Sequence, residues 1–291
     1  MTDYRSAAAE THYANVDGEQ IAYRAVGSGS PLILANRMRA TIDTWDPLFL
    51  DTLADTHQVI TFDYTGTGYS SGALPQDMST VAQQIVALAD ALGLGGFAIG
   101  GWSWGGAAAQ TLVVEHPDRV THAVMMGTNP PGPSEYPIRQ VFLERAFKPF
   151  TDLADEEVLF FEPASDRSRA AARRSHDRIN ARPDVVSRIA STKEEIEAFI
   201  AVFMAFQEDK QGRLDALTKS DVPMLIIAGD NDPSTDTRNW LPLIGKLPSA
   251  QFLVLPESGH GSQHQYPTLS ARYIATFLSD TALRVAPLSS P

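Results

Sequence analysis

A single serine stands inside a run of small residues at the centre of the chain. Ser103 lies in Gly101-Trp102-Ser103-Trp104-Gly105, after the apolar run 97–99 and before an alanine-rich stretch. This order predicts a strand, a sharp turn and a helix, with Ser103 at the corner. Larger side chains beside such a corner would clash with the strand or the helix, so glycines are expected there. The helix would also direct its free N–H groups toward the corner, where an anion can bind.

Carboxylates and a histidine follow Ser103 along the chain, each after a predicted strand. Asp230 and Asp232 follow the apolar run 223–228, and His260 follows the run 251–255. Loops after the carboxyl ends of parallel strands meet at one edge of the sheet. A histidine can remove the serine proton, and a carboxylate can hold the imidazole and stabilise its cation. The order predicts serine hydrolase chemistry, with Asp230 and Asp232 as the two candidates for the acid.

Strands and helices alternate on both sides of these residues. The Asp17-Gly18 turn predicts a hairpin over residues 12–26. Further strands are expected at 31–36, 57–64, 97–99, 120–126, 223–228 and 251–255, and helices at 46–54, 78–92, 104–116, 237–247 and 267–279. This alternation predicts an α/β fold, with a mostly parallel central sheet and helices on both faces.

The alternation stops between residues 128 and 220, where no strand is predicted. The charged, alanine-rich stretches of this segment indicate three to five helices. We therefore expect a core formed by residues 1–130 and 221–291, with a helical cap inserted at 131–220. The cap arginines are interpreted as a solvated face neutralised by acidic neighbours; they are Arg167, Arg169, Arg173, Arg174 and Arg178. Its large apolar side chains are expected mainly to pack the cap onto the core; they are Phe160, Phe161, Phe199, Phe203, Met204 and Phe206.

Composition excludes several classes of function. The 291 residues include no cysteine, which rules out disulfides, thiolate metal sites and a cysteine nucleophile. The net charge of −12 argues against nucleic acid or an anionic membrane as the main partner. No stretch approaches the roughly 20 apolar residues of a membrane span, and the N-terminus does not resemble a signal peptide. We expect a cytoplasmic protein acting on a small molecule, and the sequence makes no prediction of oligomeric state.

With these motifs taken together, the chain resembles the α/β-hydrolases over nearly its whole length. The resemblance rests on the serine turn, on the loop Asp63-x-x-Gly66-x-Gly68-x-Ser70, on Gly229-x-x-Asp232, on Gly259-His260 and on Trp45 after the third strand. It implies a triad of Ser103, Asp232 and His260, because the family spacing selects Asp232 over Asp230. It implies no metal and no organic cofactor. Asn129 stands where some members carry their acid, but it is uncharged.

The resemblance also implies an oxyanion hole made by the backbone N–H groups of Trp104 and Met38. Many relatives have His-Gly where this chain has Asn36-Arg37. We expect the Arg37 guanidinium to point outward; the alternative is that it enters the pocket and binds an acidic group of the substrate.

Aromatic residues around the serine suggest a hydrophobic substrate pocket. Met38, Trp102, Trp104 and Trp45 are its candidate lining residues, and simple packing of Trp102 and Trp45 is an equal alternative. Two further histidines are not assigned to catalysis: His264 is expected to pack, and His176 to be exposed.

These features predict a serine hydrolase that forms an acyl-enzyme on a carboxylic ester or lactone of a hydrophobic small molecule. A serine nucleophile argues against dehalogenase and epoxide hydrolase chemistry, which in this fold use an aspartate at that position. The same triad serves carbon–carbon bond hydrolysis, amide hydrolysis and perhydrolysis, so these remain alternatives. A further alternative is a ligand-binding protein that retains the triad and turns over slowly.

Overall fold

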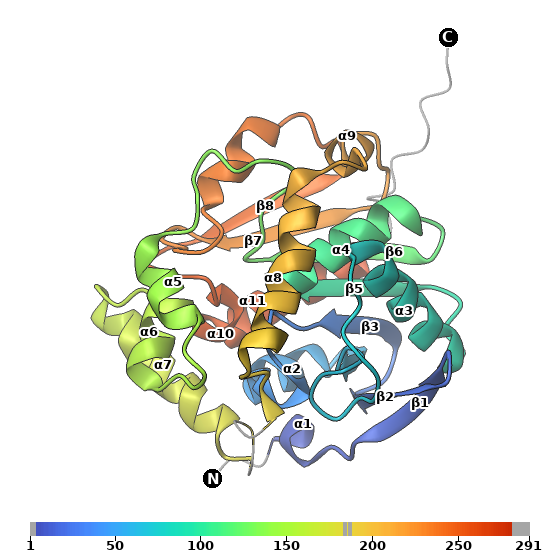
Figure 1. The fold of residues 1–291 in the computed structure, drawn as a ribbon, viewed down its shortest axis with the longest axis horizontal. Coiled ribbons are helices and arrows are strands. Elements are labelled where there is room, and N and C mark those ends of the chain that lie inside the picture. Colours follow the sequence, from blue (N-terminus) through green and yellow to red (C-terminus); the bar gives the residue numbers. More distant parts are fainter. Residues whose placement is uncertain (1–3, 183–184, 186–187, 281–291) are drawn as a thin grey trace.

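The computed structural model of the protein describes residues 4–182, 185 and 188–280. Eight strands form one sheet: β1 (His12–Val16), β2 (Glu19–Val26), β3 (Ser30–Ala35), β4 (His57–Phe62), β5 (Phe97–Trp102), β6 (Val120–Met126), β7 (Met224–Gly229) and β8 (Ala250–Leu255). Their order is β1-β2-β4-β3-β5-β6-β7-β8, and the sheet runs through the middle of the molecule (Figure 1). β2 pairs antiparallel with β1 and β4, and all other pairs are parallel.

Helices cover both faces of this sheet and bury an apolar core on each side. α3 (Met78–Ala91) and α4 (Trp104–Glu115) contribute to one core, where Ile85 and Leu112 pack with strand residues such as Ile33. α2 (Pro47–Leu53) and α11 (Pro267–Ser279) contribute to the other, through Phe49 and Ile274. The predicted fold class, a mostly parallel sheet with helices on both faces, is confirmed.

Local sequence explains where the first elements begin and turn. Asp17 and Gly18 have φ values of 51° and 90°, the positive pair that a two-residue hairpin turn requires. The Asp46 carboxylate accepts a hydrogen bond from the Leu48 N–H and caps α2, and Asp77 caps α3 through the Thr80 N–H in the same way. A short helix, α1 (Arg5–Ala8), and a 3₁₀ turn, η1 (Ile42–Thr44), complete the N-terminal part.

Five α-helices lie between β6 and β7 in the part of the chain that the structure describes, and we call residues 131–220 the inserted segment. These helices are α5 (Gln140–Ala146), α6 (Leu153–Phe160), α7 (Asp166–Ile179), α8 (Lys193–Glu208) and α9 (Arg213–Leu217). In Figure 1 they run from green to orange, and α8 crosses in front of the sheet. Phe199 and Phe206 of α8 are buried in the core that α3 and α4 share.

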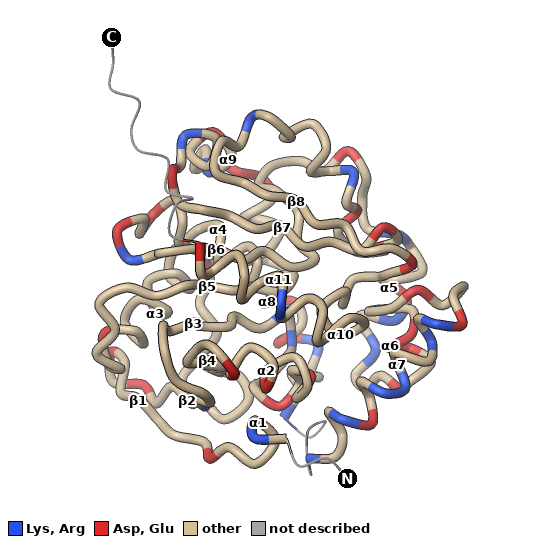
Figure 2. Tube along the Cα trace, turned by 180° about the vertical axis from the view of Figure 1, so that it is seen from behind, with Lys and Arg blue, Asp and Glu red and all other residues tan. Residues whose placement is uncertain are grey.

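Most arginines of α7 follow the expected solvated pattern. Figure 2 shows charged residues of both signs along α6 and α7, and Arg173 lies 3.6 Å from the Glu157 carboxylate. Arg178 differs, because its Nε and Nη2 donate to the buried Asp46 carboxylate at 2.8 and 2.5 Å. This ion pair fastens α7 to the start of α2, so Arg178 belongs to the junction between the inserted segment and the core.

Two elements of the C-terminal half differ from the predictions. The helix predicted over 237–247 is present as a 3₁₀ helix, η3 (Thr237–Leu243), and it ends four residues earlier than expected; Pro242 has no N–H to continue an α-helix. A short helix that was not predicted, α10 (Ser262–Gln265), begins directly after His260 and Gly261. No helix within the described residues is both long and apolar enough to cross a membrane.

Candidate active site

Ser103 sits at a strained corner between β5 and α4. Its φ and ψ are 57° and −114°, a conformation that L residues rarely adopt. The flanking glycines make the corner possible. A Cβ on Gly101 would lie 2.0 Å from the Gly105 carbonyl oxygen, and a Cβ on Gly105 would lie 2.2 Å from that of Ala35. The glycines therefore let three backbone segments meet at the serine.

The loops after β7 and β8 bring the predicted acid and histidine into contact. Nδ1 of His260 lies 2.8 Å from Oδ2 of Asp232, and both side chains are buried. The other Asp232 oxygen accepts hydrogen bonds from the N–H groups of Ser234 and Thr235, at 2.7 and 2.8 Å. The Thr235 hydroxyl donates to Oδ2 as well. These donors fix the carboxylate beside the imidazole.

The neighbouring candidates for the acid are engaged elsewhere. Oδ1 of Asp230 accepts a hydrogen bond from the Ser258 N–H at 3.0 Å, so this carboxylate joins the loop after β7 to the loop after β8. Asn129 exchanges side-chain hydrogen bonds with Asn239 and Ser134, at 3.1 Å each. Among the described residues, neither side chain forms a hydrogen bond with the imidazole of His260, whose Nδ1 contacts Asp232 and Thr235.

The loop after β3 is held firmly although it lacks a histidine-glycine pair. The Asn36 side chain donates to the Phe62 carbonyl at 2.8 Å, and the Tyr64 hydroxyl donates to the Asn36 carbonyl at 2.8 Å. The close approach of Gly105 to this loop puts the start of α4 directly against it. Trp104 is the first residue of α4, so its N–H has no partner within the helix. The N–H groups of Trp104 and Met38 thus belong to adjoining segments.

The buried Asp63 carboxylate joins the loop after β3 to the glycine-containing loop after β4. Its Oδ1 accepts from the Ile42 N–H at 2.7 Å, and its Oδ2 accepts from the Tyr69 N–H at 2.9 Å. A Cβ on Gly68 would lie 2.2 Å from the Asp63 carboxylate, so only glycine fits there. Burial raises the pKa of Asp63 to about 7. The Asp-Gly-Gly-Ser motif therefore supports the loop that carries Met38.

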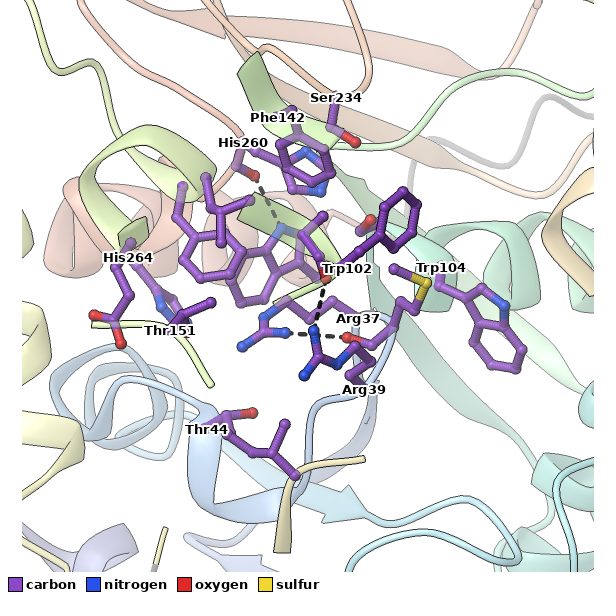
Figure 3. A pocket seen from close by; sticks show the side chains of 18 of the residues that line it. Arg37, Arg39, Thr44, Trp102, Trp104, Phe142, Thr151, Ser234, His260 and His264 are labelled. Atoms are coloured by element: carbon purple, nitrogen blue, oxygen red, sulfur yellow. Dashed lines mark hydrogen bonds between the residues drawn. The ribbon is translucent and has the colours of Figure 1, made fainter. Parts of the chain in front are cut away.

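Ser103 and His260 line a cavity of about 240 Å³. Figure 3 shows this cavity from close by, with His260 labelled. The predicted residues Arg37, Met38, Trp102 and Trp104 line it too. Trp102 also donates from its indole to the His260 carbonyl at 2.9 Å, which joins the serine turn to the histidine loop. Trp45 is not among the lining residues; it is buried and stacks on Phe49, so the packing alternative is correct for it.

The inserted segment supplies most of the apolar wall. Of the residues that we expected mainly to pack it onto the core, four line the cavity: Phe160, Phe161, Phe203 and Met204. The other two, Phe199 and Phe206, are buried in the core and do not line this cavity. Phe142, Phe147 and Phe150 also line the cavity and were missed, because nothing in the sequence distinguishes an aromatic residue over a cavity from one over a core.

The expectation that the Arg37 guanidinium points outward is wrong. It lines the cavity, with Cζ 4.5 Å from the centre of the Phe160 ring and 5.3 Å from that of Trp102. Nη1 donates to the Met38 carbonyl at 3.0 Å, whereas the buried Nε has no hydrogen-bond partner among the described residues. Burial, with the positive charge of Arg39, lowers the pKa of Arg37 to about 10.

Arg39, two residues further on, was missed by the sequence analysis. It has a φ of 67° and is buried. Its guanidinium donates to backbone carbonyls of the inserted segment at 2.6 to 2.9 Å; the acceptors are Ala146, Lys148, Pro149 and Ala190. Arg39 therefore joins the loop after β3 to two stretches of the inserted segment, before α6 and before α8.

The two histidines not assigned to catalysis, His264 and His176, both contact other protein groups. His264 is buried against Trp102, and its Nε2 accepts a hydrogen bond from the Asp46 N–H at 3.3 Å. Burial lowers its pKa to about 4, so it is neutral near pH 7. It also touches the cavity wall. His176 is partly buried rather than exposed, and its Nδ1 lies 2.9 Å from Glu156 Oε2.

The arrangement has the parts needed for nucleophilic catalysis. A serine on a strained turn and a histidine paired with a carboxylate face one cavity, and the free end of a helix adjoins it. Within the described residues, no three His, Asp or Glu side chains are grouped as ligands for a metal ion.

Comparison with known proteins defines the class. The family model described as alpha/beta hydrolase fold matches residues 32–267. The chain therefore belongs to the α/β-hydrolase family. A solved alpha/beta hydrolase fold protein from Chitinophaga pinensis superposes with a TM-score of 0.81 at 28% identity, covering 94% of this chain and 99% of that one.

Two curated relatives carry names that specify activities. "Putative carbamate hydrolase RutD" of Caulobacter vibrioides is 28% identical over 273 residues, which cover 92% of this chain and 94% of that protein. A 2-hydroxymuconate semialdehyde hydrolase of Pseudomonas putida is 29% identical over 238 residues, covering 78% and 79%. The chain is thus similar to hydrolases whose names specify different substrates.

Proposed function

We propose that the protein is a serine hydrolase that cleaves a carboxylic ester or lactone of a hydrophobic small molecule through an acyl-enzyme. The observation that carries the proposal is the buried Asp232–His260 pair, at 2.8 Å, in the wall of the same cavity as the strained Ser103. Membership of the α/β-hydrolase family supports a hydrolytic reaction.

The triad residues take complementary roles in this reaction. Asp232 engages Nδ1 of His260, which leaves Nε2 as the nitrogen that accepts the Ser103 proton. Ser103 Oγ attacks the carbonyl carbon, and the N–H groups of Trp104 and Met38 stabilise the oxyanion. His260 returns the proton to the leaving alkoxide. Water, activated by the same histidine, then releases the acid and restores the serine.

The lining of the cavity supports a hydrophobic substrate. Phe142, Phe160 and Phe203 contribute apolar surface from the inserted segment, and Trp102 contributes it from the core. We propose that the inserted segment is a cap that excludes water from the acyl-enzyme. A cavity of about 240 Å³ suits a small molecule rather than a polymer.

Pre-steady-state kinetics with p-nitrophenyl butyrate test the proposal. Acylation followed by slower deacylation should give a burst of p-nitrophenol close to one equivalent per active site. Ser103→Ala should abolish both the burst and the steady-state rate. Stoichiometric binding without turnover would contradict the proposal and favour the ligand-binding alternative.

A second panel separates ester hydrolysis from the activities in the relatives' names. It should include a carbamate and 2-hydroxymuconate semialdehyde, each at the same enzyme concentration as the ester and a lactone. Perhydrolysis is tested by adding hydrogen peroxide to the ester assay. We expect the highest kcat/KM for an ester or lactone; a higher value for the carbamate or the semialdehyde would assign the triad to that reaction instead.

A further inference from the structure

Three arginines at the junction between the core and the inserted segment have different surroundings. Arg39 donates to four backbone carbonyls, and Arg178 forms an ion pair with Asp46. These two cations are therefore satisfied by the protein. Arg37 has one hydrogen bond, to the Met38 carbonyl, and no carboxylate partner within 4 Å in the described part of the chain.

The charge on the cavity wall is unbalanced around Arg37. Apart from the two histidines, the ionisable lining residues are Arg37, Arg39 and Glu156. The Glu156 carboxylate contacts His176 at 2.9 Å, so it is already engaged. A partly buried cation without a carboxylate in contact is costly, and burial together with the charge of Arg39 lowers the pKa of Arg37, which the more distant Glu156 offsets only in part. The cavity thus carries excess positive charge in a protein whose net charge is −12.

The Arg37 guanidinium is held in place for a ligand. It lies against the Phe160 and Trp102 rings, and its Nε is buried without a partner among the described residues. Ring stacking restricts the side chain while leaving N–H donors unused. The guanidinium donates to the carbonyl of Met38, the proposed oxyanion donor, and Arg37 lines the same cavity as Ser103.

We propose that Arg37 binds a carboxylate of the substrate, so that the substrate class is a monoester or lactone carrying a free carboxylate on its acyl side. A guanidinium matches a carboxylate with two parallel hydrogen bonds and equal charge. One unpaired cation fits a monoanion better than a phosphate dianion. This inference rests on the proposed hydrolase function, because it assigns the group that accompanies the scissile carbonyl.

A matched pair of esters tests the inference on the wild-type protein. Mono-p-nitrophenyl adipate ends in a carboxylate, and p-nitrophenyl adipamate has the same chain ending in an uncharged primary amide. We expect kcat/KM to be at least about tenfold higher for the adipate, the range of a charge-assisted hydrogen bond. Equal values for the two esters would overturn the inference and leave the hydrolase function intact.

Variants separate binding by Arg37 from support of the loop. Arg37→Met keeps length and should lower kcat/KM for the adipate at least about tenfold while changing the adipamate less than about threefold. Arg37→Lys should retain part of the preference, and Arg173→Met, which removes a charge from the outer face of α7, should change neither ester. Equal losses on both esters in Arg37→Met would mean that Arg37 supports only the loop, and would overturn the inference.

Calorimetric binding to Ser103→Ala distinguishes failure of this inference from failure of the proposed function. Monomethyl adipate should bind this variant more tightly than methyl adipamate, and the preference should vanish in Ser103→Ala/Arg37→Met. If the wild-type protein hydrolyses neither ester but shows this binding preference, the hydrolase proposal fails and the carboxylate site stands. If it hydrolyses esters and Ser103→Ala shows no preference, the carboxylate site fails alone.

Discussion

Nδ1 of His260 lies 2.8 Å from Oδ2 of Asp232, while Asp230, two residues earlier, holds the Ser258 N–H. The two aspartates of one loop are therefore bound to different groups. Sequence spacing alone left both as candidates, and the resemblance to α/β-hydrolases selected Asp232. The geometry makes them a matched pair for mutagenesis.

Asp232→Asn should lower kcat by roughly 10² or more, because the amide can hold the wrong tautomer of His260 and removes the charge that stabilises its cation. Asp230→Asn keeps an acceptor for the Ser258 N–H and should stay within about tenfold of wild type. Both variants are measured on one activated ester. A large loss in Asp230→Asn with near-normal activity in Asp232→Asn would reverse the assignment.

Replacing Ser103 should reveal the strain stored at the serine turn. Ser103→Ala and Ser103→Gly should both be inactive, but glycine accepts the φ of 57° without strain. We expect Ser103→Gly to have the higher free energy of unfolding, by about 1 kcal/mol. Urea unfolding of the two variants measures this difference, and a more stable Ser103→Ala would show that the turn is not strained.

Arg39 should stabilise the junction with the inserted segment. Arg39→Met leaves four carbonyls without their donor, two of them in buried hydrogen bonds, so the free energy of unfolding should fall by about 3 kcal/mol. Arg173→Met is the control, since a surface change should stay within about 0.5 kcal/mol of wild type. Equal urea midpoints for Arg39→Met and Arg173→Met would show that Arg39 does not stabilise the junction.

His264 should make stability depend on pH. Its pKa is lowered from 6.5 to about 4 by burial, so between these values the unfolded chain binds a proton that the folded protein does not. Its contribution is fully present above pH 6.5 and is lost as the pH falls toward 4. Between pH 7 and 4, wild type should therefore lose about 3 kcal/mol relative to His264→Gln. Urea unfolding of both proteins across this range tests the sign; a constant difference would contradict it.

The fold, and the loops that carry Ser103, Asp232 and His260, could be predicted because their signals are local. Glycines at the serine turn, Asp-Gly in the hairpin and apolar periodicity each act within a few residues. The direction of Arg37 could not be predicted in this way, since Phe160, which lies against its guanidinium, comes from the far end of α6. The aromatic lining was misjudged for the same reason: whether Phe203 faces a cavity or a core depends on tertiary packing.

Pro242 in η3 was a local signal against a regular α-helix. Pro242 stands inside the stretch predicted as a helix, and its missing N–H explains the 3₁₀ form. Arg39, in contrast, gave no local signal, because its four carbonyl partners come from residues more than 100 positions away.

Labelling with a fluorophosphonate measures directly whether Ser103 is an activated nucleophile. The probe is added to wild type and to Ser103→Ala, with Asp230→Asn as a variant that should label normally, and the adduct is located by peptide mass spectrometry. We expect one adduct per chain in the wild type, on the peptide that contains Ser103, and no adduct in Ser103→Ala. An unlabelled wild-type protein, or an adduct that persists in Ser103→Ala, would contradict it.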